Sequence, residues 1–153
     1  MKNKYITHSI FQTKNLGKKL AKRVLNQQVK NQAVVLALVG ELGGGKTTFL
    51  QGFAKGLGIK EKILSPTFVI MKRFKIKDGR FKNFYHFDCY RIQKEKEILD
   101  LGFGQVVSNP QNIVAAEWAE RAQKIVPKNA IWIKFEFIDE KRRDITVKTK
   151  NQK

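Results

Sequence analysis

The sequence has few of the residues that mark disulfide-bonded, secreted or membrane-spanning proteins. Cys89 is the only cysteine in 153 residues, so no internal disulfide can form. There is no run of about eighteen apolar residues, which excludes a transmembrane helix. Residues 1–12 contain no apolar segment of signal-peptide length. We therefore expect a cytoplasmic protein.

Acidic residues are also scarce, with 13 Asp and Glu against 31 Lys and Arg, and the formal charge is +18. A charge of this size suggests an acidic partner such as RNA or an acidic protein face. The competing interpretation is compositional, because the bases are mostly lysines spread along the chain. No basic tract coincides with a known nucleic-acid motif, and such tracts are usually solvated faces. The sequence favours the second interpretation and leaves the first open.

The chain is long enough to bury a core and shows neither repeats nor a low-complexity linker. We expect one domain over 1–153, with 150–153 as a frayed tail.

An apolar run leading into a glycine-rich loop is the most informative stretch. Residues 33–39 are uncharged and rich in valine and leucine, which predicts a buried strand. Residues 40–49 read GELGGGKTTF and match the GxxxxGKT motif, and the residues after them are expected to be helical. Strand, glycine loop and helix form the context that a phosphate-binding loop requires.

Each residue type in this loop has a physical role. The glycines at 43–45 allow positive φ angles, so successive N–H groups can point into one concavity beside a helix N-terminus. Lys46 can reach the β- and γ-phosphates, and Thr47 can offer a hydroxyl to Mg²⁺. The expected ATP-binding loop comprises Gly40, Glu41, Leu42, Gly43, Gly44, Gly45, Lys46, Thr47 and Thr48.

The rest of the chain predicts an α/β fold with a mixed parallel and antiparallel sheet flanked by helices. The Asp78-Gly79 pair predicts a two-residue hairpin turn, and hairpin strands are antiparallel. Ser9 is expected to cap the first helix. Expected helices are 10–26, 46–56 and 93–101, and expected strands are 5–8, 33–39, 67–76, 81–88, 112–118, 130–138 and 144–149.

Two acids stand at predicted strand ends, where open α/β sheets bind ligands. Asp88 shares a strand face with His86, and Glu117 ends the apolar run that starts at Asn112. In P-loop proteins, a second acidic strand holds Mg²⁺ directly or through water. Asp88 could instead cap a turn, Glu117 could be an ordinary strand-end acid, and a buried hydrogen-bonded role is favoured for His86. Trp118 either lies over the nucleotide or packs in the core.

Several motifs together resemble one family. They are GELGGGKTTF at 40–49, SPTF at 65–68, HFDCYRI at 86–92, an acidic helix ending in Leu101-Gly102, and EW at 117–118. In this order and spacing, the chain resembles the bacterial ATPases of tRNA threonylcarbamoyladenosine biosynthesis, the TsaE family, formerly YjeE. The resemblance extends from about residue 10 to about residue 147. The phosphate loop is shared by many families, whereas the other motifs are far more specific.

The resemblance implies a small single-domain P-loop NTPase fold that binds Mg²⁺ and ATP and hydrolyses ATP weakly alone. It implies two partner proteins with a sugar-kinase-like fold. One of them transfers threonylcarbamoyl to the adenosine next to the anticodon of tRNA. The ATP cycle is expected to let that transferase complex turn over repeatedly.

The resemblance also assigns expected roles to residues. Lys46, Asp88 and Glu117 are the expected catalytic residues, with Thr47 and Glu117 as Mg²⁺ ligands. Trp118 is expected beside the site. The expected switch loop is Ser65, Pro66 and Thr67, and the expected adenine contacts include Ile10 and Arg143. The chain departs from the family at Gly44, where alanine is usual, at Cys89, where a larger apolar residue is usual, and in its high charge.

Two other functions stay open at this point. A small-molecule kinase would need an acceptor pocket and usually a mobile lid, and the sequence contains no arginine-rich insertion of lid length. A binding module would use the nucleotide as a switch and dock RNA or protein through its basic face.

Overall fold

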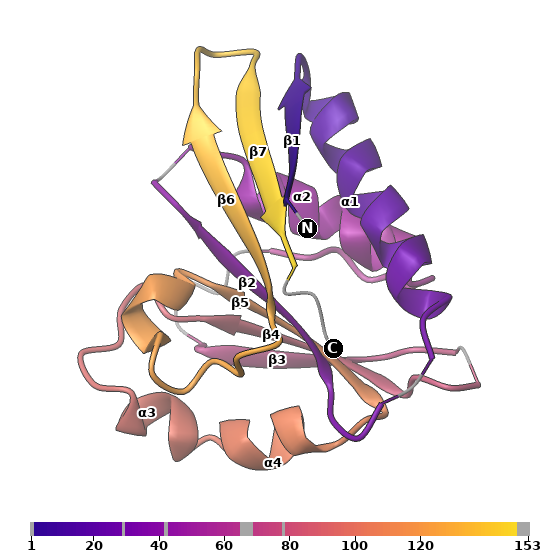
Figure 1. The fold of residues 1–153 in the computed structure, drawn as a ribbon, viewed down its shortest axis with the longest axis vertical. Helices are drawn as coiled ribbons and strands as arrows, with labels where there is room; N and C mark the ends of the chain where they lie inside the picture. The colour runs from indigo at the N-terminus through magenta and orange to yellow at the C-terminus, as the bar shows by residue number, and fades with distance from the viewer. Residues whose placement is uncertain (1, 29, 42, 65–68, 78, 150–153) are drawn as a thin grey trace.

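One mixed sheet of seven strands, in the order β1-β7-β6-β2-β5-β4-β3, forms the centre of the protein (Figure 1). The structure is a computed structural model that describes residues 2–28, 30–41, 43–64, 69–77 and 79–149. The strands are β1 Lys2–Thr7, β2 Val34–Gly40, β3 Met71–Lys75, β4 Asn83–Asp88, β5 Asn112–Glu117, β6 Ile131–Phe137 and β7 Arg143–Lys148. The helices are α1 Ile10–Leu25, α2 Lys46–Gly56, α3 Lys96–Leu99, α4 Phe103–Ser108 and the 3₁₀ helix η1 Ala119–Ala122.

The sheet is parallel at its centre and antiparallel at both edges. Strand β2 pairs in parallel with β5 and β6, and β4 pairs in parallel with β5. The outer pairs β1–β7, β6–β7 and β3–β4 are antiparallel. The predicted mixed sheet is therefore confirmed. The parallel strands bring the C-terminal ends of β2, β4 and β5 to the same edge of the sheet.

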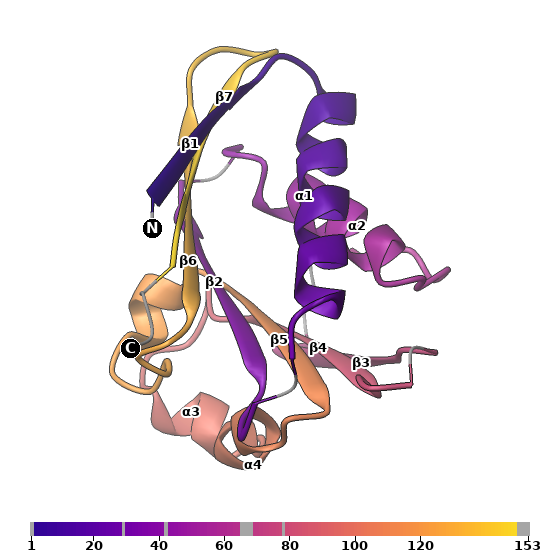
Figure 2. The same cartoon turned by 45° about the vertical axis from the view of Figure 1, so that its right-hand side comes forward.

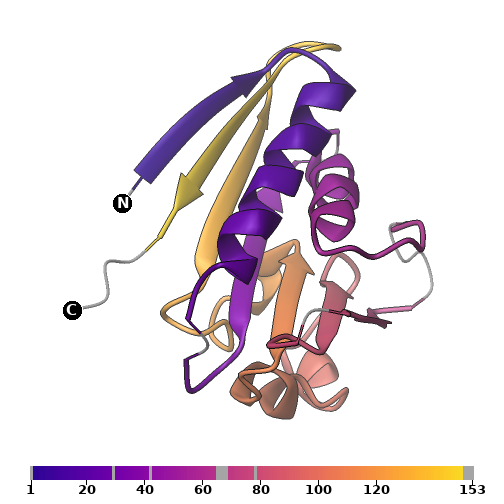
Figure 3. The same ribbon diagram turned by 90° about the vertical axis from the view of Figure 1, so that its right-hand side faces the viewer.

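Helices cover both faces of the sheet (Figures 2 and 3). Strand β2 supplies both cores, because its side chains alternate between the faces. Leu36 and Leu38 pack with α1 and α2 on one face. Val35 and Ala37 belong to the core on the other face, which includes residues of α3, α4 and η1. The end of β2 is thus held from both sides.

The two helices α1 and α2 pack so closely that their backbones touch. A Cβ atom on Gly17 would lie 2.1 Å from the carbonyl oxygen of Phe49, and one on Gly52 would lie 1.9 Å from that of Lys14. No side chain fits at either crossing point. This contact fixes α1 against the helix that follows the phosphate loop.

Most predicted elements are present, with shifts of a few residues at their ends. Helix α1 begins after Ser9, whose hydroxyl accepts a hydrogen bond from the Gln12 N–H at 3.0 Å, as predicted. The β3–β4 hairpin is also present. Its predicted two-residue turn is wrong, because the Ile76 N–H donates to the Lys82 carbonyl at 2.8 Å and the connection is therefore longer. Asp78 itself lies outside the described residues.

The segment after β4 differs more from the prediction. The expected helix 93–101 is the single turn α3, and a second helix, α4, follows it. Gly102 separates the two with φ of 88°. Six residues are too few to show a helical period, which explains why α4 was missed. None of the helices in the described part of the chain is long and apolar enough to cross a membrane.

Candidate functional site

The phosphate loop connects the end of β2 to the start of α2, as the sequence predicted. Gly40 has φ of 139°, and a Cβ atom there would lie 2.3 Å from the Phe135 carbonyl oxygen on β6. Gly45 is the N-cap of α2 with φ of 98°. Both positions therefore require glycine, and the loop delivers the free N–H groups of α2 to the sheet edge. Leu42 lies outside the described residues.

Lys46 is buried against this loop. Its ammonium donates hydrogen bonds to the carbonyl of Gly40 and, at 3.0 Å, to that of Glu41. The same nitrogen lies 4.2 Å from the centroid of the Trp118 ring. Burial lowers the pKa of Lys46, and the nearby carboxylates, Glu117 first among them, oppose that shift. The charge is thus held at the loop by weak neutral acceptors, which phosphate oxygens could replace.

The two predicted acids lie side by side. Asp88 and Glu117 end β4 and β5 and are paired in the parallel register. Asp88 is 9% exposed and Glu117 only 2%. Thr47 donates its hydroxyl to Oε1 of Glu117 at 3.2 Å, which joins the acid to the first turn of α2. The Oδ1 atom of Asp88 accepts from the Tyr90 N–H at 3.0 Å.

His86 belongs to this cluster, although the sequence did not predict it as a functional residue. Its Nε2 atom lies 2.6 Å from Oε2 of Glu117, a hydrogen bond in which the carboxylate accepts. The imidazole is 1% exposed. The predicted role as a buried, hydrogen-bonded histidine is confirmed. The only available signal was the alternation that placed His86 on the same strand face as Asp88.

The residues around Thr47 fit a magnesium ion. Within the described ranges, no group of three or more His, Cys, Asp or Glu could hold a metal. Mg²⁺ does not require such a group, because it keeps several waters and takes one or two carboxylates together with phosphate oxygens. The Thr47 hydroxyl and the carboxylates of Glu117 and Asp88 supply these hard oxygen donors. Their roles as ligands stay predictions.

Trp118 stands at the site and not deep in the core. It is half-buried and adopts a left-handed conformation with φ of 57°. Its ring contacts Lys46 on one side and lies 4.9 Å from the Tyr90 ring, with Arg121 5.6 Å away. The geometry thus agrees with the expectation that came from the family resemblance.

The expected adenine contacts approach the loop from α1 and β7. Arg143 and Thr13 each have a carbon atom 3.6 Å from the position of a Cβ on Gly45. Thr13, which the sequence did not indicate, is buried and hydrogen-bonds with Thr7 at 2.7 Å. Ile10 lies in the same first turns of α1 and is 69% exposed.

Among the other predicted loop residues, Glu41 and Gly43 are exposed, Gly44 is buried and Thr48 is half-buried. The predicted switch residues Ser65, Pro66 and Thr67 lie outside the described residues.

A glycine loop after the central parallel strand, with acids ending the next two strands, defines the P-loop class of α/β nucleotide-binding folds. Comparison with known proteins places the chain more closely. The family model described as "Threonylcarbamoyl adenosine biosynthesis protein TsaE" matches residues 7–145. This chain belongs to the TsaE family.

Several relatives carry the name tRNA threonylcarbamoyladenosine biosynthesis protein TsaE. The one from Bacillus subtilis is 40% identical over 112 residues, which are 73% of this chain and 67% of the relative. The one from Haemophilus influenzae is 32% identical and covers 86% and 80% of the two chains. The crystal structure of Bacillus subtilis YdiB superposes with a TM-score of 0.73 at 29% identity, over 97% of this chain and 86% of that one.

Proposed function

We propose that this protein binds and slowly hydrolyses Mg-ATP, and that this cycle supports threonylcarbamoyl transfer to the adenosine next to the anticodon of tRNA. It acts with two partners, a threonylcarbamoyl transferase and that enzyme's sugar-kinase-like paralogue. The observation that carries the proposal is the link from Thr47 through Glu117 to His86, with Asp88 in register beside it. This link joins the phosphate loop to both strand-end acids.

The chemistry consists mostly of positioning and charge neutralisation. Lys46 exchanges its two carbonyl acceptors for phosphate oxygens, and the loop N–H groups bind the same phosphates. Mg²⁺, when bound, neutralises charge that develops on the phosphoryl oxygens. Thr47 and Glu117 are the residues that would hold it.

Glu117 and Asp88 divide the remaining work. Both oxygens of Glu117 are engaged, one by Thr47 and one by His86, so this carboxylate is fixed in orientation. A fixed carboxylate suits a metal shell. Asp88, at the tip of the neighbouring strand, then orients or deprotonates the attacking water.

Two variants test the nucleotide chemistry. Lys46→Ala removes the charge that meets the phosphates, so we expect ATP-dependent function to be lost. Asp88→Asn keeps the size of the side chain and loses the base, so we expect ATP binding to persist while hydrolysis stops. Glu120→Gln changes an exposed acid on η1 by the same step and serves as the control. Equal loss of binding and turnover in Asp88→Asn would make Asp88 a structural residue or a main metal ligand.

The biological role requires the partners. ATP turnover is measured with the protein alone, with the two partner proteins, and with partners plus unmodified tRNA, while modified adenosine is followed by mass spectrometry. We expect slow turnover alone, and stimulation and repeated modification in the full mixture. Neither association nor stimulation would overturn the proposed role and leave the ATPase chemistry intact.

A further inference from the structure

Helix α1 is basic throughout and lies beside a hollowed surface at a distance from the ATP site. Residues 1–40 contain no Asp or Glu at all. Helix α1 carries five bases, Lys14, Lys18, Lys19, Lys22 and Arg23. Of the ion pairs formed between described residues, none involves this helix. The positive charge of the chain is therefore uncompensated along α1.

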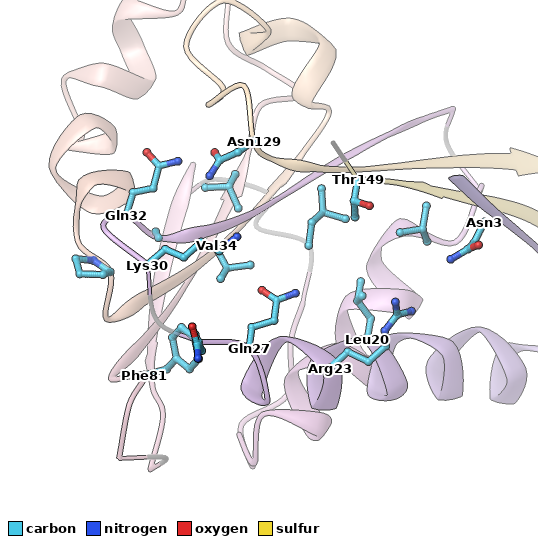
Figure 4. Close-up of a pocket in the computed structure, with 16 residues that line it drawn as sticks. Asn3, Leu20, Arg23, Gln27, Lys30, Gln32, Val34, Phe81, Asn129 and Thr149 are labelled. Atoms are coloured by element: carbon cyan, nitrogen blue, oxygen red, sulfur yellow. The ribbon is translucent and has the colours of Figure 1, made fainter. Parts of the chain in front are cut away.

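A hollow of about 400 Å³ lies between the C-terminal end of α1 and the N-terminal ends of β2 and β6. Figure 4 shows Arg23 and Gln27 pointing from α1 and its C-terminal extension toward it, with Asn129 and Gln32 on the opposite side. Half of its lining is polar, and the rest is apolar. Arg80 closes one wall by donating to the carbonyls of Leu25 and Gln27.

A second hollow, of about 430 Å³, continues along α1 toward β1 and shares Leu20, Arg23 and Val147 with the first. Asn15, Lys19, Arg23 and Gln27 follow at steps of four residues and form one stripe along this groove. Tyr5 of β1 stands on the facing wall, half-buried. None of the residues that line either hollow is acidic.

We propose that this α1 groove binds a single-stranded segment of RNA. Lys19 and Arg23 meet two phosphates, the amides of Asn15 and Gln27 offer paired donors and acceptors to base edges, and the ring of Tyr5 offers a stacking surface. Cations, amides and an aromatic ring together are the chemistry of single-strand recognition. Membership of a tRNA-modification family makes tRNA the natural source of such a segment.

Two features favour a polynucleotide over a free nucleotide or an acidic peptide. The groove extends from Asn15 past the end of α1, which is longer than one nucleotide needs. Its amides match base edges, whereas an acidic peptide would need only the cations. The groove shares no lining residue with the loop at 40–47, so the proposal stands apart from the proposed ATP chemistry.

The test measures binding of unmodified tRNA and of a short single-stranded RNA by fluorescence anisotropy over a range of salt concentrations. The variant K19Q/R23Q removes both cations, and K94Q/K96Q removes two exposed cations around α3 as the matched control. We expect affinity of the first variant to fall about tenfold or more and its salt slope to fall by about 1.4, at about 0.7 per phosphate on a single strand. The control should stay within about twofold of the parent.

The uncharged variant N15A/Q27A separates recognition from charge. We expect it to weaken RNA binding with an unchanged salt slope, because it removes base contacts and no phosphate contact. Binding of a fluorescent ATP analogue should be the same in every variant, which also verifies folding. That readout keeps failure here distinct from failure of the ATPase proposal.

Four results would overturn the proposal. They are no measurable RNA binding, equal losses in K19Q/R23Q and K94Q/K96Q, full competition by millimolar AMP, and full competition by polyglutamate of matched charge. The second result would mean a general field of the whole protein. The third would make the groove a mononucleotide site, and the fourth a docking site for an acidic protein.

Discussion

Replacing His86 by leucine tests whether the buried histidine holds the acid at the centre of the site. The change leaves Oε2 of Glu117 without its partner at 2.6 Å while the carboxylate stays 2% exposed. A hydrogen bond to a charged group contributes about 1.5–3 kcal/mol, and a buried charge that loses its partner costs about 3–5 kcal/mol. Because Thr47 still donates to Oε1, we expect the lower end, a loss of about 3 kcal/mol in the free energy of unfolding.

A double-mutant cycle measures the pair itself. The free energy of unfolding is obtained from urea titrations of the parent, His86→Leu, Glu117→Leu and the double variant. Once the charge is gone, the loss of histidine matters less, so the double variant should lose about 2 kcal/mol less than the sum of the single variants. His8→Leu is the matched control, because His8 is the exposed histidine of the chain and should change stability by less than about 0.5 kcal/mol.

Function provides a second readout in the same proteins. Glu117 loses one of its two fixed contacts in His86→Leu, so the Mg²⁺ concentration for half-maximal ATP turnover should rise while His8→Leu leaves it unchanged. Additive losses within about 0.5 kcal/mol, together with an unchanged Mg²⁺ requirement, would refute the reasoning that His86 orients Glu117.

Three further predictions concern other parts of the fold. Gly52→Ala should cost about 2–3 kcal/mol in urea unfolding, because its Cβ would lie 1.9 Å from a carbonyl oxygen of α1, whereas Gly104→Ala has no atom within 4 Å and should be neutral or slightly stabilising; equal effects would refute the tight crossing. Burial raises the pKa of the Cys89 thiol to about 12, so it should resist alkylation in the native protein at neutral pH, and its contribution to stability should fall between pH 9 and about 12 as the unfolded thiol ionises first. Rapid native alkylation at pH 8 would contradict this. Mg-ATP should change tryptophan emission in the parent and in Trp132→Phe but leave Trp118→Phe unchanged, because Trp118 contacts the phosphate-loop lysine; a retained signal in Trp118→Phe would place the reporter elsewhere.

Local patterns were the most predictable part of the structure. The β2–loop–α2 unit could be read from residues 33–55 because strand, glycine loop and helix are consecutive in the chain. The strand-end positions of Asp88 and Glu117 followed from apolar runs that stop at an acid. Helix α4 was missed because six residues give too little periodicity, and the long β3–β4 connection was missed because Asp78-Gly79 has the composition of a tight turn.

Contacts between distant segments could not be predicted in the same way. The bond from His86 to Glu117 depends on the register of β4 on β5, which single-strand patterns do not encode. The position of Thr13 beside Gly45 depends on how α1 crosses α2. The charge of +18 was visible at once, but the α1 groove exists only after the helix is placed against β1.

The glycine crossing between α1 and α2 has a mechanical consequence. Backbones that touch at Gly17 and Gly52 leave no compressible side-chain layer between the helices, so they cannot slide independently. Any displacement of the first turn of α2 during nucleotide exchange is transmitted to α1 as the motion of one stiff lever. The far end of that lever, at Arg23 and Gln27, lies at the opposite edge of the sheet. The molecule is thus built to carry a small movement from one edge to the other without loss.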